Sequence, residues 1–61
     1  MDIDTMDPNI LISIINMKLR DYYSNLIVLC EDMELNKEII QHKLNSIGYY
    51  YLETQNQFKA R

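Results

Sequence analysis

The chain has 61 residues, of which 48% are hydrophobic and 25% charged, and its net charge is −3. This length allows a single domain with a small core. Small domains often depend on a disulfide, a metal ion or a partner chain. Because Cys30 is the only cysteine and His42 the only histidine, we expect no internal disulfide, no metal site and no cofactor.

The sequence also lacks the signals of membrane insertion and secretion. No apolar run approaches the roughly 18 residues that span a bilayer, and the first residues have no basic region. We therefore expect a cytoplasmic protein that does not enter a membrane.

The first seven residues contain three aspartates and two methionines and show no periodicity. They are predicted to form a mobile acidic leader (residues 1–7), followed by one domain (residues 8–61). Asp7 and Pro8 then predict the start of a helix, because aspartate caps free N–H groups and proline fits the first helical position.

The run from Asn9 to Tyr23 has apolar residues at the spacing of one helix face. The predicted core face consists of Leu11, Ile14, Ile15, Leu19 and Tyr22. Ile10, Ile12 and Met17 fall outside this stripe and widen the apolar surface. In so small a domain these three are candidates for self-association, although burial in the core is an equally good interpretation.

Two shorter helices are predicted next. Ser24 is expected to cap a helix over about residues 25–32, and Asn36 a helix over residues 37–47. Gly48, the only glycine, is placed to end that helix in a left-handed conformation. The predicted inward residues are Leu26, Leu29, Cys30 and Met33 in the first of these helices, and Ile40, Leu44 and Ile47 in the second.

The remaining residues predict a hairpin. Residues 49–52 favour a strand, residues 53–56 are polar, and residues 57–59 are expected to pair back. Alternation directs Tyr49 and Tyr51 towards the helices and leaves Tyr50 exposed. The predicted fold class is therefore mainly α: a three-helix, helix-turn-helix-like domain with a short C-terminal β-hairpin, similar to a winged helix. Glu34 departs from the motif, because it occupies the turn position where glycine is common.

A helix-turn-helix reading makes the third helix a candidate for binding DNA. Residues 1–35 have two basic and seven acidic side chains, a net charge of −5, whereas residues 36–61 have four and two, a net charge of +2. This asymmetry favours the second half as a nucleic-acid surface, although few cations predict weak binding. A solvated helix face is the alternative interpretation. The candidates are Lys37, Gln41, His42, Asn45, Tyr50, Lys59 and Arg61.

Enzymatic chemistry is not expected. A thiol nucleophile would require Cys30 beside His42, but the predicted helices place Cys30 on a buried face and His42 on an outer one. The chain also lacks a glycine-rich phosphate loop and the spacing of a calcium loop.

The chain contains five short motifs: Asp7-Pro8, Lys18-Leu19-Arg20-Asp21, Leu29-Cys30, Ile47-Gly48-Tyr49 and Asn56-Gln57-Phe58. Together they resemble a family of short bacterial proteins classed only as a domain of unknown function. The resemblance extends from Asp7 to Phe58 and implies a stand-alone cytoplasmic protein with no established site residues. Ile27 and Val28 stand where that family is expected to have more polar residues, which adds to an exposed apolar patch. Lys18 and Asp21 are expected to form a weak surface pair.

Two functional hypotheses follow. The first is a small DNA-binding or regulatory protein that uses the third helix and the hairpin. The second is a protein-interaction module that self-associates, as a homodimer, through Ile10, Ile12 and Met17. Both can hold together, because many helix-turn-helix proteins bind DNA as dimers.

Overall fold

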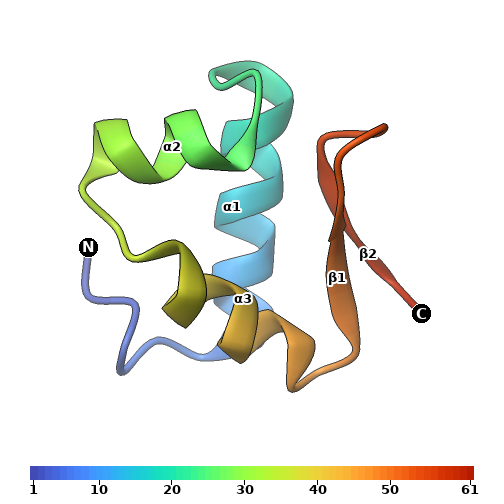
Figure 1. The fold of residues 1–61 in the computed structure, drawn as a ribbon. Helices are drawn as coiled ribbons and strands as arrows, with labels where there is room; N and C mark the ends of the chain where they lie inside the picture. Colours follow the sequence, from blue (N-terminus) through green and yellow to red (C-terminus); the bar gives the residue numbers. More distant parts are fainter.

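The computed structural model describes residues 1–61 and consists of three helices followed by a two-stranded antiparallel hairpin (Figure 1). α1 contacts both other helices and β2, and α3 contacts β1. The predicted fold class, a mainly-α domain with a C-terminal β-hairpin, is confirmed. The elements are α1 (Pro8–Asp21), α2 (Leu26–Met33), α3 (Lys37–Asn45), β1 (Tyr49–Leu52) and β2 (Gln57–Ala60).

Side-chain caps determine where the helices begin. As predicted, Asp7 accepts a hydrogen bond from the backbone N–H of Asn9 (2.8 Å), and Asn36 caps α3. The predicted Ser24 cap is wrong. Asn25 caps α2 instead, because its side-chain oxygen reaches the N–H of Val28 (2.8 Å).

The helix ends differ from the periodic pattern in two places. α1 ends at Asp21, so Tyr22 leaves the helix and its side chain is 70% exposed rather than buried in the core. Tyr23 takes the inward place and packs against the core. α3 ends at Asn45, two residues earlier than predicted, and Gly48 has the expected left-handed backbone (φ +84°). Glu34 is also left-handed (φ 56°).

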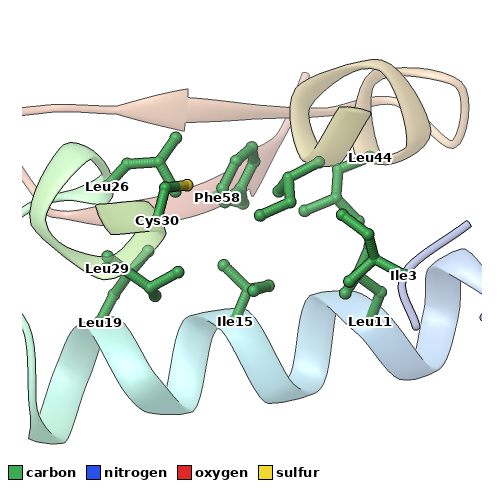
Figure 2. Close-up of a cluster of buried hydrophobic side chains, with 10 residues drawn as sticks. Ile3, Leu11, Ile15, Leu19, Leu26, Leu29, Cys30, Leu44 and Phe58 are labelled. Carbon is green, nitrogen blue, oxygen red and sulfur yellow. The ribbon is translucent and has the colours of Figure 1, made fainter. Parts of the chain in front are cut away.

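The core is one cluster to which every helix and β2 contribute. Figure 2 shows Leu11, Ile15 and Leu19 pointing from α1 into this cluster, with Phe58 in its middle. Ile14, also predicted to face the core, is only half-buried. The buried residues are Ile3, Leu11, Ile15, Leu19, Leu26, Leu29, Cys30, Ile40, Leu44 and Phe58.

The leader is attached to the domain. Residues 1–7 form no helix or strand, but the Ile3 side chain is 5% exposed and lies beside Leu11 (Figure 2). The ammonium of Lys43 on α3 donates hydrogen bonds to three leader carbonyls, those of Ile3 (2.7 Å), Asp4 (3.0 Å) and Met6 (2.5 Å). One apolar side chain, that of Ile3, and one cation, that of Lys43, thus hold residues 1–7 against the helices.

The hairpin is fastened to α1 by the Asn16 side chain. β1 and β2 pair with Tyr50 opposite Lys59 and Tyr51 opposite Phe58. Asn16 Nδ2 donates to the carbonyl of Phe58 (3.0 Å), and the N–H of Phe58 donates to Asn16 Oδ1 (2.8 Å). Asn16 thus satisfies both backbone polar groups of Phe58, on the side of β2 that faces away from β1.

Asn56 links the hairpin turn to both α1 and α2. Its Nδ2 donates to the carbonyls of Leu19 (3.0 Å) and Tyr23 (2.9 Å), so it caps the C-terminus of α1. Its Oδ1 accepts from the Tyr51 hydroxyl (2.7 Å), which in turn accepts from the N–H of Leu26 at the start of α2 (3.2 Å). The Asn-Gln-Phe motif therefore has a structural role, and functional side chains have to be sought elsewhere.

Candidate functional site

The predicted nucleic-acid-binding residues fall into two groups. The first consists of three residues of α3: Lys37 and Gln41, which line a cleft between the helices, and His42, which is exposed outside it. The remaining four lie where α3 ends and the hairpin opens. We refer to this second group, Asn45, Tyr50, Lys59 and Arg61, as the hairpin patch.

Backbone and ring contacts hold the hairpin patch together. The Arg61 N–H donates to the carbonyl of Gly48 (3.1 Å), and the Gly48 N–H donates to that of Asn45 (2.9 Å). The Arg61 guanidinium carbon lies 4.6 Å from the centre of the Tyr50 ring, and Lys59 is directly opposite Tyr50 on the neighbouring strand. The patch therefore combines two cations with an aromatic ring, the groups that bind phosphates and stack on bases.

The two acidic side chains of residues 36–61 lie away from this patch. Glu38 is in the first turn of α3, and Glu53 follows β1 in the hairpin turn, whereas Asn45 ends α3 and Tyr50 is near the start of β1. The positive charge of residues 36–61 is thus concentrated at the open end of the hairpin.

Three of the other four basic side chains, Lys18, Arg20 and Lys43, are engaged elsewhere. Lys43 binds the leader carbonyls, and Lys18 lies 5.2 Å from the centre of the Tyr22 ring. The predicted pairing of Lys18 with Asp21 is wrong, because Asp21 forms an ion pair with Arg20 (2.8 Å), the only one in the structure. The hydrogen bond from Arg20 lowers the pKa of the Asp21 carboxyl.

The cleft, which we call the α2–α3 cleft, has a volume of about 280 Å³. The start of α2 forms one wall, α3 another, and β1 with the following turn a third. Lys37 and Glu53 both line it, and neither belongs to an ion pair. The complete lining is Asn25, Leu26, Ile27, Lys37, Gln41, Tyr51 and Glu53.

The predicted self-association residues are less exposed than their pattern indicated. Ile12 packs against the core and Met17 is half-buried, so Ile10 alone of the three is exposed (56%). A second exposed apolar group lies on α2, where Ile27 is 57% and Val28 39% exposed.

Cys30 and His42 do not share an environment. Cys30 is buried in the core, where its sulfur lies among apolar side chains (Figure 2). Burial raises the pKa of the thiol, opposed by the positive charge of Lys37. His42 is exposed on α3. No three side chains among His, Cys, Asp and Glu come close enough to hold a metal ion. None of the helices has both the length and the apolar character needed to cross a membrane.

Comparison with known families assigns the chain. Residues 5–58 match the family described as Domain of unknown function (DUF4250). The chain belongs to this family. The DUF4250 match includes the whole α2–α3 cleft, whereas Lys59 and Arg61 of the hairpin patch lie beyond it. No curated protein and no solved structure matched the chain.

Proposed function

We propose that the protein is a non-catalytic nucleic-acid-binding module and that the hairpin patch makes the contact. One observation carries the proposal: Arg61 lies over the Tyr50 ring and Lys59 is paired with Tyr50 across the hairpin, whereas Glu38 and Glu53 lie at the other ends of α3 and the hairpin. Phosphates are attracted by the cations, and a base stacks on the ring or on the guanidinium plane.

The number of cations sets the expected strength. Each neutralised phosphate contributes about 0.9 to the slope of log K against log salt for duplex DNA, and about 0.7 for single strands. Two cations therefore predict a slope of about −2 for a duplex, and binding in the weak range of about 10⁻⁴ M. Lys37 and Gln41 lie in the cleft, so α3 contributes mainly through Asn45 and the exposed His42.

The buried thiol supports the non-catalytic part of the proposal. A nucleophilic cysteine needs an accessible thiolate, but Cys30 is buried and its pKa is raised. His42, the usual base for such a thiol, is exposed on another helix.

Fluorescence anisotropy with labelled single-stranded and duplex DNA tests the binding. At low ionic strength we expect a salt-sensitive signal that the double substitution Lys59→Ala/Arg61→Ala abolishes. The control is Lys18→Ala, which removes the other cation that lies against a tyrosine ring and should leave binding unchanged. The proposal fails if wild-type protein gives no salt-sensitive signal, or if both variants lose it equally.

A further inference from the structure

The α2–α3 cleft carries an unusual combination of charges. Lys37 lines it from α3 and Glu53 from the hairpin turn, yet the two are not joined by an ion pair. Between them the lining is partly apolar, with Leu26, Ile27 and Tyr51. The cleft therefore presents one free cation and one free anion beside an apolar floor.

The apolar surface continues beyond the cleft. Ile27 lines the cleft and yet is 57% exposed, so it also projects from the rim. Val28, next to it on α2, is exposed too. Exposed apolar groups rimmed by polar ones are typical of protein interaction sites. A small molecule inside about 280 Å³, below the usual 300–1,000 Å³ of ligand pockets, would leave these outer side chains uncovered.

We infer that this surface joins two copies of the chain in a two-fold symmetric dimer. A two-fold axis brings the same patch of each copy together, so the patch has to be complementary to itself. One cation and one anion on a single cleft satisfy this condition, because Lys37 of each copy then meets Glu53 of the other. Each Ile27 enters the opposite cleft. A partner with only cations or only anions at this surface would place a like charge against either Lys37 or Glu53.

The small size of the protein limits the strength of the dimer. A typical stable interface buries about 800 Å² on each partner, which is about one fifth of the 4057 Å² surface of this chain. A cleft with its immediate rim covers less. We therefore expect a reversible dimer with a dissociation constant in the micromolar range.

This dimer is independent of the proposed nucleic-acid binding. The interface contains Lys37 and Gln41 but none of the hairpin patch, so either property can fail without the other. If both hold, dimerisation doubles the phosphate contacts and steepens the salt dependence of binding.

Sedimentation equilibrium from 5 µM to 500 µM, concentrations of about the expected dissociation constant and above, tests the dimer. Ile27→Asp should shift the protein to monomer across this range. Ile10→Asp is the matched control, because Ile10 has the same side chain and nearly the same exposure (56% against 57%) but lies on α1. Far-UV circular dichroism verifies that both variants remain folded. A monomeric wild type refutes the inference, as does a dimer that Ile10→Asp disrupts and Ile27→Asp does not.

A charge exchange locates the interface independently of the isoleucines. Lys37→Glu places two anions on the cleft, and Glu53→Lys places two cations. Each variant alone should dimerise about tenfold more weakly than wild type, because both cross-contacts become repulsive. Mixed in equal amounts, the two variants should form a heterodimer of wild-type strength. Variants that dimerise normally alone, or a mixture that stays as weak as its components, would show that Lys37 and Glu53 do not meet across the two-fold axis.

Discussion

Replacing Asn56 with glycine changes two contributions to folding stability that have opposite signs. Asn56 has a left-handed backbone (φ 51°), a conformation that costs a residue with a side chain about 1 kcal/mol and glycine nothing. The same side chain donates to the carbonyls of Leu19 and Tyr23 and accepts from the Tyr51 hydroxyl. Asn56→Gly removes the backbone cost and these three hydrogen bonds together.

The stabilisation lost with the hydrogen bonds should exceed the stabilisation gained by relieving the left-handed backbone. At about 1 kcal/mol each, they contribute about 3 kcal/mol, and relief of the left-handed backbone returns about 1 kcal/mol. We expect Asn56→Gly to lower the free energy of unfolding by about 2 kcal/mol. For a domain of this size the total is about 3–9 kcal/mol, and the melting temperature should fall by about 8–16 °C.

Urea and thermal denaturation followed by circular dichroism measure this change. Glu34→Gly is the control, because Glu34 is left-handed to the same degree (φ 56°) but its side chain makes no hydrogen bond. That variant should gain up to about 1 kcal/mol. Equal free energies of unfolding for Asn56→Gly and Glu34→Gly would refute the reasoning, since the Asn56 side chain would then contribute nothing.

Further predictions concern the leader and the thiol. Lys43→Met removes the hydrogen bonds to the leader carbonyls and should lower the free energy of unfolding by about 1–3 kcal/mol. It should also speed amide hydrogen exchange in the leader, whereas Lys59→Met, which alters an exposed side chain, should do neither. The double variant Ile3→Ala/Lys43→Met should lose less free energy of unfolding than the sum of the two single variants, because both substitutions release the same segment. Full additivity would contradict the idea that Ile3 and Lys43 hold the leader together. Because burial raises the pKa of Cys30, alkylation of folded protein at pH 8 should be far slower than in urea, and equal rates would contradict the buried position.

Local signals in the sequence predict most of the elements correctly. Asp7-Pro8 and Asn36 begin helices because their side chains cap N–H groups two or three residues away, a relation that the sequence displays directly. Gly48 has the predicted left-handed backbone for an equally local reason, because glycine adopts positive φ without steric cost. Where two neighbouring residues compete, as Ser24 and Asn25 do, the pattern does not decide between them. Helical periodicity places Tyr22 on the core face, but α1 ends at Asp21. The backbone beyond that point turns Tyr22 outward and brings Tyr23 against the core.

Contacts between distant residues account for what the sequence analysis missed. Ile3 stands alone among polar neighbours and shows no periodicity, and its burial depends on Lys43, which is 40 residues away. Nothing in the sequence near Asn16 distinguishes it from other polar residues on a helix, because its partner, the backbone of Phe58, is 42 residues away. The resemblance includes the motif Asn56-Gln57-Phe58. This motif is the only sequence feature that indicates a specific hydrogen-bond partner for the Asn56 side chain. Lys37 and Glu53 line the same cleft because the hairpin packs against α3, a contact that the sequence does not display.

The side chain of Asn16 has a consequence for how the molecule meets others. A two-stranded hairpin normally leaves unpaired backbone groups along its border, and these invite a strand from a neighbouring molecule. Here the amide of Asn16 imitates a peptide unit of a third strand and occupies the N–H and C=O of Phe58. Growth of the sheet past β2 is therefore blocked at its midpoint by a helix. Domain-swapped or fibrillar strand pairing at the β2 border therefore requires the loss of the Asn16 contact first.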